Sequence, residues 1–325
     1  MANYQTKDIR NIALMGHGSE GKTTLTEALL FAAKAIDRQG RVEDGNTVTD
    51  FDPEEIKRGF SLTLSLAPVM WETSKINFID TPGFLDFQGE VDAGIRVADA
   101  GIIVLDGKAG VEVGAELAWD KTTEAGIPKA FFINKSDDPD AHFDKVFEQL
   151  HEQFGSAVCP VLVPYKDGKN VLFLNLIERK AYSFDAKGNR TTADFDAKME
   201  EVAAQYTDTL SEALASTSEE LLDKYFEEGE ISQEEAVEAL HQGIIDGSIV
   251  PVFSGSAVNL WGITFLLDTI ADSFPRPTAK KVEKIIDGDG FKDIAIDPEG
   301  EPAIFVFKTI ADPFVGKMSF FKVMS

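Results

Sequence analysis

The strongest constraint on this chain is the octapeptide Gly16-His17-Gly18-Ser19-Glu20-Gly21-Lys22-Thr23. It fits the pattern G-x-x-x-x-G-K-[ST], and it lies between an apolar run at residues 12–15 and a segment of helical character. A strand that feeds such a loop into a helix directs backbone N–H groups and the positive helix end at phosphate groups. Lys22 can then reach the outer phosphates, and the Thr23 hydroxyl can ligate Mg²⁺. Taken alone, the pattern also fits a glycine-rich turn.

We expect this loop to hold phosphate groups through His17, Gly18, Ser19, Glu20, Gly21, Lys22, Thr23 and Thr24. Within it, His17 is interpreted as a packing and hydrogen-bonding residue, with a catalytic role as the alternative.

Strands and helices alternate from residue 9 to residue 154, which predicts a parallel sheet covered by helices. The predicted strands are Ile9–Met15, Lys75–Asp80, Gly101–Asp106 and Lys129–Asn134. The predicted helices are Thr23–Gln39, Glu112–Ala125 and Asp140–Phe154. Ligands bind such α/β folds at the carboxyl ends of the strands. With residues 247–280, which return to a buried strand and an amphipathic helix, residues 1–154 are expected to form one domain.

Residues 155–246 change character and are interpreted as an α+β subdomain inserted into that domain. Strands are predicted at Val158–Pro164 and Asn170–Asn175, with a hairpin over Ala181–Thr192. Acidic helices are predicted at Asp194–Ala215, Ser218–Phe226 and Ser232–Gly243. Cys159, the single cysteine, is expected to be a buried small apolar residue. The acidic helices are by default solvated, with a binding face as the alternative.

After the helix predicted at Trp261–Phe274, residues 281–300 are expected to form a linker, because Pro275 and Pro277 end the helix. Residues 301–325 predict two strands, Ala303–Ile310 and Lys317–Met324. Two strands cannot bury a core alone, so we expect the sequence to be a fragment of a longer protein.

A second motif, Asp80-Thr81-Pro82-Gly83, follows a predicted core strand. A carboxylate at a strand end can hold Mg²⁺, and the Gly83 N–H can approach a terminal phosphate because no side chain blocks it. The pattern D-x-x-G is common in turns, and its significance here comes from its position after the phosphate loop.

A third motif, Asn134-Lys135-Ser136-Asp137, begins at the end of the core strand predicted at Lys129–Asn134. Asp137 can accept hydrogen bonds from N1–H and the exocyclic amine of guanine, a donor pair that adenine lacks. Sites built on such bonds reject the mismatched base by roughly 10⁴-fold. Asn134 would brace this loop against the phosphate loop, and the stem of Lys135 would stack on the base.

Two weaker segments complete the expected site. The backbone of Gly255, Ser256 and Ala257, after the last core strand, would contact the guanine carbonyl. The segment 58–62 carries Ser61, whose hydroxyl could close over Mg²⁺ and be released on hydrolysis; as bare sequence it also reads as a surface loop. The predicted metal ligands are therefore Thr23, Ser61 and Asp80.

Composition excludes several function classes. The 325 residues carry a formal net charge of −25, which argues against direct, charge-driven DNA binding. The first residues form no apolar signal segment, and no run of residues is long and apolar enough to span a membrane. We therefore expect a cytoplasmic protein.

The motifs in this order resemble the translational GTPases, and the resemblance is greatest to elongation factor G. The segment from Asp44 to Trp71 resembles the first switch region of that family, and Asp80-Thr81-Pro82-Gly83 continues into Asp86-Phe87 as in its DTPGHxDF motif. Residues 155–246 resemble its inserted subdomain, which touches the ribosomal stalk. Residues 302–321, including Asp312-Pro313-Phe314, resemble the start of its β-barrel second domain. The resemblance implies a P-loop GTPase that binds GTP or GDP with Mg²⁺ and acts on the ribosome.

The chain departs from that family at the position that matters most for catalysis. The family histidine that positions the attacking water is Phe84 here, and phenylalanine has no polar atom. Losing a positioned polar group typically costs on the order of 10²–10⁴ in rate. The switch threonine is Ser61, the usual isoleucine before it is Phe60, and the loop aspartate is Ser19. Catalysis would therefore rest on Lys22 and Gly83, and we expect slow turnover.

Three functions remain open at this point. The first is an elongation factor G-like GTPase with slow hydrolysis. The second is a GTP-binding module that signals by occupancy and hardly hydrolyses. The third is a ribosome-protection or release-type relative that shares this front half.

Overall fold

The computed structural model describes residues 4–325 except 169, 281, 289, 298 and 313. At its centre is a seven-stranded sheet in the order β2-β3-β1-β4-β5-β11-β6, parallel throughout except where β2 pairs with β3. Its strands are β2 (Ser65–Trp71), β3 (Ser74–Asp80), β1 (Ile9–Met15), β4 (Ala100–Asp106), β5 (Lys129–Asn134), β11 (Val250–Ser254) and β6 (Val158–Pro160). The predicted α/β fold with a mostly parallel sheet is confirmed.

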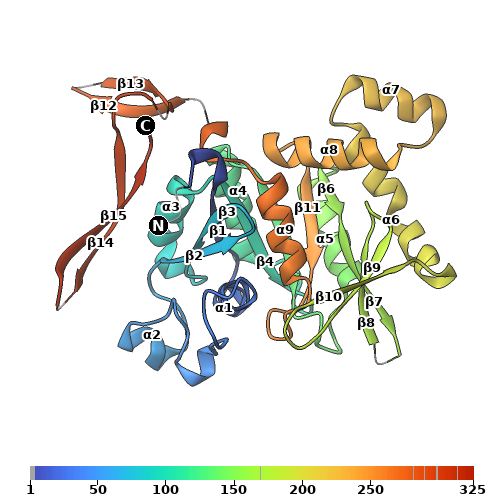
Figure 1. Ribbon diagram of the computed structural model, residues 1–325, viewed down its shortest axis with the longest axis horizontal. Helices are drawn as coiled ribbons and strands as arrows, with labels where there is room; N and C mark the ends of the chain where they lie inside the picture. Colours follow the sequence, from blue (N-terminus) through green and yellow to red (C-terminus); the bar gives the residue numbers. More distant parts are fainter. Residues whose placement is uncertain (1–3, 169, 281, 289, 298, 313) are drawn as a thin grey trace.

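Helices cover both faces of this sheet (Figure 1). On one face α1 (Lys22–Ala32) packs against α9 (Ile263–Ser273), and on the other lie α3 (Gln88–Val97), α4 (Val113–Ala125) and α5 (Phe143–Phe154). Strands covered on both faces are continuously apolar, as in Ile102–Leu105 of β4, whose side chains are fully buried. The sheet is thereby a rigid base for the loops at its carboxyl edge.

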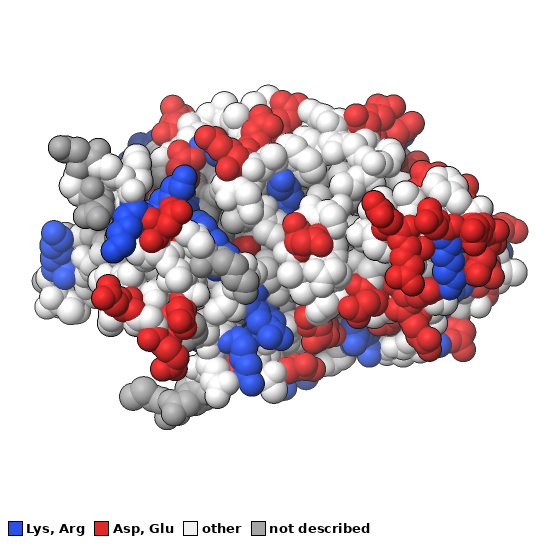
Figure 2. Space-filling view, turned by 90° about the horizontal axis from the view of Figure 1, so that it is seen from above, with Lys and Arg blue, Asp and Glu red and all other residues white. Residues whose placement is uncertain are grey.

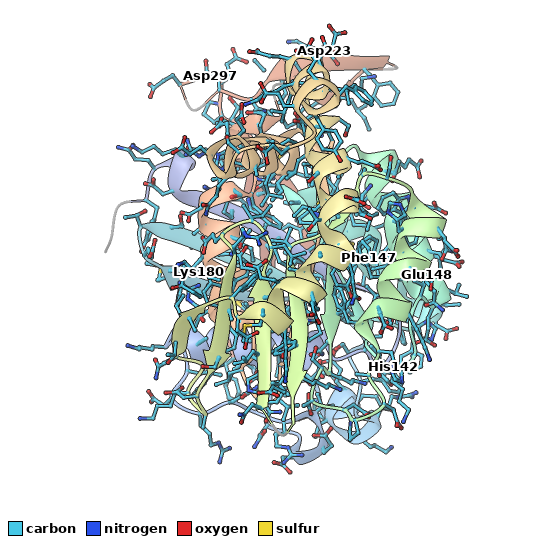
Figure 3. The ribbon with its side chains drawn as sticks, turned by 90° about the vertical axis from the view of Figure 1, so that its right-hand side faces the viewer. His142, Phe147, Glu148, Lys180, Asp223 and Asp297 are labelled. Atoms are coloured by element: carbon cyan, nitrogen blue, oxygen red, sulfur yellow. The ribbon has the colours of Figure 1, made fainter. Side chains whose placement is uncertain are left out.

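The inserted subdomain combines a four-stranded antiparallel sheet with three helices. The strands are β7 (Leu162–Asp167), β8 (Asn170–Asn175), β9 (Lys180–Phe184) and β10 (Arg190–Asp194), and the helices are α6 (Ala197–Ala215), α7 (Glu219–Glu228) and α8 (Gln233–Asp246). Figure 3 shows Phe147 of α5 where that helix meets α6. The Tyr206 ring of α6 lies edge-on to Phe147, with centroids 5.8 Å apart, so aromatic packing joins the subdomain to the main domain.

Two hairpins follow α9. They are β12 (Val282–Asp287) with β13 (Gly290–Ala295), and β14 (Ile304–Asp312) with β15 (Gly316–Val323). Residues 281–300, expected as a linker, contain the first of these hairpins. Asp287 pairs with Gly290 at the end of that hairpin, and Gly288, directly after Asp287, takes the left-handed conformation at φ 60°, as hairpin turns require. Positions 281, 289 and 298 of that segment lie outside the described residues, as do residues 1–3 and Pro313.

Other boundaries differ from the predicted ones. The first helix ends at Ala32 and not at Gln39, because Lys34 adopts a left-handed φ of 58° that a helix cannot continue through. The strand predicted at Val158–Pro164 is two strands separated by Val161. The first of them, β6, pairs with β11 in the main sheet, so the insertion begins after it.

Apart from the hairpin β12–β13, three further helices and strands were not predicted. They are α3, β2 and the short helix α2 (Pro53–Arg58), which Asp52 caps by accepting a hydrogen bond from Glu54 N at 2.7 Å. Strand β2 lies at the edge of the sheet, where Pro68 is tolerated because it faces no further strand.

Candidate nucleotide-binding site

The expected site residues lie on loops at the carboxyl edge of the main sheet. The loop Gly16–Gly21 leaves β1, Asp80 ends β3, Asn134 ends β5, and Gly255 follows β11. Since β1 lies between β3 and β4, and β5 between β4 and β11, these loops form one continuous row. The sheet order thus brings together motifs that are far apart in the sequence.

The phosphate loop depends on glycine at its last position. Gly21 has φ 92°, a conformation that favours glycine. A Cβ atom there would lie 2.5 Å from Asn134 Nδ2. The loop can therefore turn into α1 only without a side chain at this position, which is the reason for the second glycine of the motif.

Lys22 begins α1 and is almost fully buried. Its Nζ donates hydrogen bonds to the carbonyl oxygens of Gly16, at 3.1 Å, and His17. Burial lowers the pKa of Lys22, while Glu20, Asp80 and Asp50 act in the opposite direction. The ammonium group is thus held at the centre of the loop, beside carboxylates that favour its charged form.

A buried carboxyl group lies inside the same loop. Glu20 Oε2 accepts a hydrogen bond from His17 N, and Glu20 Oε1 has no partner among the described residues. Burial raises the pKa of Glu20 to about 8, although Lys22 opposes the shift. His17 Nδ1 accepts from Gly114 N at 3.3 Å, so the His17 side chain joins the loop to α4, in keeping with a packing role.

The three predicted metal ligands share a second cluster with two further residues, Asp50 and Thr49. Thr23 Oγ1 lies 3.1 Å from Ser61 Oγ, which donates to Asp50 Oδ1 at 2.7 Å. Thr49 Oγ1 donates to Asp80 Oδ2 at 2.9 Å. The cluster is therefore a set of oxygen atoms from two carboxylates and three hydroxyls, next to Lys22.

This cluster fits Mg²⁺, which prefers oxygen ligands and retains water and phosphate ligands. Asp80 Oδ1 and Asp50 Oδ2 are buried and accept no hydrogen bond from any described residue. Burial, and then the Asp50 charge, raises the pKa of Asp80 to about 7. A cation would satisfy both oxygens. Within the described part of the chain no group of three or more His, Cys, Asp or Glu side chains is placed to hold a metal, so phosphate and water would have to complete the set.

The irregular segment that carries Thr49 and Asp50 is held by a buried residue of α1. Glu27, which is fully buried, accepts hydrogen bonds from Gly40 N at 2.7 Å and Val48 N at 2.5 Å. These bonds fix the loop against α1 without regular secondary structure.

Gly83 lies directly against the phosphate loop. A Cβ atom at Gly83 would lie 2.4 Å from Lys22 Nζ, 2.6 Å from His17 O and 2.8 Å from Gly18 N. The absence of a side chain is therefore what allows this segment and the phosphate loop to approach. The Gly83 backbone is well placed to meet a terminal phosphate held by the loop.

Phe84, the next residue, covers the same loop with its ring. A Cβ atom at Gly18 would lie 3.3 Å from Phe84 Cζ, a tight contact, so the ring lies directly over this glycine. The rings of Phe84 and Phe60 are 4.4 Å apart, centroid to centroid. Two of the departures noted in the sequence, Phe84 and Phe60, thus form one apolar contact over Gly18, with Phe84 37% exposed.

Asn134 connects the remaining loops. Its Nδ2 donates to Glu20 O at 3.0 Å, and its Oδ1 accepts from Ala257 N at 3.0 Å. The side chain therefore braces the phosphate loop and the Gly255–Ala257 segment at once. Ser256 N donates to Trp261 O at 3.1 Å. In this structure the N–H groups of Ser256 and Ala257 bond to protein, and the expected contact from this segment to a guanine carbonyl stays a prediction.

The two other residues of that motif differ in their surroundings. Lys135 Nζ donates to Ser19 O at 2.8 Å and to Asp106 Oδ2 at 2.6 Å. Burial raises the pKa of Asp106, but hydrogen bonds from Lys135 and from backbone outweigh it and leave the pKa lowered. Asp137 is exposed, and no side-chain hydrogen bond joins it to a described residue. Its carboxylate is free to accept donors from a base.

A cavity of about 190 Å³ opens over the phosphate loop. Its walls come from the loop, from the segments around Asp50 and Ser61, and from Gly83 and Phe84. It therefore contains the residues expected at the phosphate and metal end, whereas Asp137 lies outside its lining.

Asp50 and Thr49 are the site residues that motif analysis missed as contributors to the metal cluster. Both lie in the segment that resembles the first switch region, but that resemblance assigned them no metal role, and the path of their loop depends on Glu27 of another element.

Comparisons with known proteins agree with this arrangement. Residues 7–276 match the family model described as the elongation factor Tu GTP-binding domain. The whole chain is similar to a crystal structure of a protein from Thermus thermophilus, with 30% sequence identity and a TM-score of 0.85. The match covers 98% of this chain and 46% of that one, so this chain spans about half the length of that protein. None of the described helices is both long and apolar enough to cross a membrane.

Proposed function

Because the chain belongs to the translational GTPases, in the family of the elongation factor Tu GTP-binding domain and related to elongation factor G, we propose that it is a GTP- and Mg²⁺-dependent switch that acts on the ribosome with slow hydrolysis. Guanine-nucleotide binding follows from membership of this family. The site of action, the rate and a cytoplasmic location are our proposal.

One observation supports the proposal: Lys22, the Thr23–Ser61–Asp80 cluster and Asp137, whose carboxylate has no hydrogen-bond partner among the described residues, lie along a single edge of the sheet. Phosphates, a divalent cation and a guanine base need these three kinds of group in a row. Asn134 fixes the spacing between the ends of that row, since it is bonded to both neighbouring loops.

The chain's own residues would act mainly by binding and orientation. Lys22 would move from the loop carbonyls to the outer phosphates and neutralise their charge. Thr23, Ser61 and Asp80 would hold Mg²⁺, which when bound neutralises charge on the phosphate oxygens. The Gly83 N–H would contact the terminal phosphate, close to the loop.

Phe84 cannot accept or donate a proton, so no side chain at that position orients the attacking water. Its contact with Phe60 and Gly18 also makes the face over the loop apolar. Both effects slow hydrolysis, and they favour a second candidate function, a module that signals by GTP occupancy.

Phosphate release from GTP, with and without ribosomes, separates these functions. We expect slow phosphate release from the wild-type chain. On ribosomes, Phe84→His should raise the release rate about 10²-fold or more, which is the usual contribution of a positioned general acid–base group. Leu85→His is the matched control, because it adds an imidazole at the adjacent exposed position. A near-zero rate that Phe84→His leaves unchanged would show that Phe84 is not the cause.

The inserted subdomain offers a surface for a ribosomal partner. Figure 2 shows acidic side chains gathered over the end of the molecule that carries α6 and α7, and α7 exposes Phe226 among Glu219, Glu220, Glu227 and Glu228. We propose that this face meets a ribosomal protein, such as the stalk protein that the family resemblance implies. Charge reversal at Glu227 and Glu228 should weaken ribosome-stimulated phosphate release while intrinsic nucleotide affinity stays the same.

A further inference from the structure

The segment Ser61–Leu64 links the metal-side cluster to the rest of the molecule. At one end, Ser61 contacts Thr23 and Asp50 through its hydroxyl. At the other end, the Leu64 side chain is fully buried and β2 begins with the next residue. The direction in which the Ser61 hydroxyl points therefore depends on what holds the short backbone stretch between them.

Two carboxylates hold the N–H groups of that stretch. Glu55 Oε1 of α2 accepts from Leu62 N at 2.9 Å and from Thr63 N at 3.1 Å. Glu90 Oε2 of α3 accepts from Leu64 N at 2.8 Å. Hydrogen bonds to charged acceptors are stronger than neutral ones, so these amides are fixed from both sides.

A single lysine from the C-terminal hairpin closes the arrangement. Lys308 Nζ of β14 donates to Leu64 O and, at 3.2 Å, to Thr63 Oγ1. Burial lowers the pKa of Lys308, although Glu90 and Glu55 both favour its charged form. Lys308 thus adds a positive charge to the same backbone stretch that the two carboxylates hold, close enough for both to favour its charged form.

We propose that Lys308 is a positioning residue for the phosphate site: it holds Ser61–Leu64 so that the Ser61 hydroxyl faces the metal-side cluster, and it thereby couples the hairpin β14–β15 to the nucleotide. This inference rests on the proposed function. Coupling between two sites is reciprocal. A terminal phosphate that orders Ser61 therefore also stabilises the hairpin contact, and the hairpin contact favours GTP over GDP.

The same hairpin offers a matched control. Lys322 of β15 donates to Val97 O at 3.0 Å and to Asp99 Oδ1 at 2.6 Å. This buried ion pair also anchors the hairpin to the main domain, but it does not touch residues 61–64. Loss of Lys322 therefore loosens the hairpin without removing the contact to the switch segment.

The test uses the full chain and fluorescent analogues of GDP and of non-hydrolysable GTP, titrated with Mg²⁺ and with EDTA. Lys308→Met should weaken binding of the GTP analogue about tenfold in Mg²⁺, the effect of losing a charge-assisted hydrogen bond, and leave GDP binding unchanged. The loss should vanish in EDTA. Lys308→Arg should retain the preference for the GTP analogue over GDP. Lys322→Met should keep the wild-type ratio of the two affinities even if its melting temperature falls.

The inference would be overturned if Lys308→Met lost affinity for both nucleotides equally, or lost none. It would also be overturned if Lys322→Met showed the same selective loss of affinity for the GTP analogue. If Lys308→Met does not fold, Glu90→Ala is measured instead, because it removes the hydrogen bond to Leu64 N. The same selective loss of affinity for the GTP analogue is expected, and an equal loss for both nucleotides or no loss would contradict the inference. A wild-type chain that binds neither analogue would overturn the proposed function as well. If the wild-type chain binds both analogues and the Lys308 variants give the contrary result, only the inference about Lys308 is overturned.

Discussion

Gly83→Ala is the substitution whose effect follows most directly from the coordinates. The added methyl carbon would lie 2.4 Å from Lys22 Nζ, 2.6 Å from His17 O and 2.8 Å from Gly18 N. The lysine end could rotate away, but the other two atoms are backbone of the phosphate loop. Such overpacking typically costs about 1–3 kcal/mol. It should be relieved by movement of residue 83 away from the loop.

That movement separates the Gly83 N–H from the place of the terminal phosphate and disturbs Lys22. Because about 1.4 kcal/mol corresponds to tenfold in affinity, we expect GTP binding to weaken roughly tenfold to a hundredfold. GDP binding should weaken less. Equilibrium titration with the fluorescent GTP and GDP analogues in Mg²⁺ measures both constants, and thermal unfolding of the same samples reports any general loss of stability.

Gly89→Ala is the matched control. Gly89 lies in α3, six residues further on, and a Cβ atom there would meet nothing within 4 Å. Alanine in a helix is favoured over glycine by about 0.5–1 kcal/mol, so this variant should melt at or above the wild-type temperature and bind both nucleotides normally. If Gly83→Ala binds GTP as tightly as the wild-type chain, the close approach of residue 83 to the phosphate site is wrong.

Three further predictions test other parts of the site. Lys22→Ala should lower GTP affinity by about a hundredfold or more, since it removes charge-assisted hydrogen bonds to phosphate; titration that finds GTP affinity retained would remove Lys22 from the site. Asp137→Asn should shift the preference from guanine towards xanthine nucleotides in competition binding, because the amide presents a donor where the carboxylate presents only acceptors; Asp138→Asn should change nothing, and unchanged guanine selectivity in Asp137→Asn would contradict the base-reading role. Burial raises the pKa of Glu20 to about 8 in the folded chain, against an ordinary value of 4.5, so its contribution favours folding below pH 4.5 and is lost as the pH rises towards 8. Glu20→Gln should therefore flatten the decline of unfolding free energy over that interval, measured by denaturant titration without nucleotide, and a wild-type slope in the variant would contradict the assignment.

Much of the main domain could be predicted because its signals are local. The buried strands are continuous apolar runs, and each nucleotide motif comes directly after one of them, as with Asp80 and Asn134. Parallel strands place such ends at a common edge, so the motifs could be expected to meet without knowledge of the strand order.

The parts that escaped prediction depend on contacts between distant residues. The path of the segment around Asp50 is fixed by Glu27 of α1, and nothing near Asp50 in the sequence records this. The contact of Lys308 with Leu64 joins positions 244 apart. The hairpin at 282–295 is different, because its turn lies in the glycine-rich run 287–290, a turn signal that is local in the sequence.

The central claim is that one edge of the sheet selects a guanine nucleotide and holds its phosphates with a metal. Calorimetric titration of the full chain with GTP and with ATP, each in Mg²⁺, tests it most directly. We predict that ATP binds about 10⁴-fold more weakly than GTP, since Asp137 would be left unpaired by adenine. Equal affinity for the two nucleotides, or the absence of heat with either, would contradict the claim.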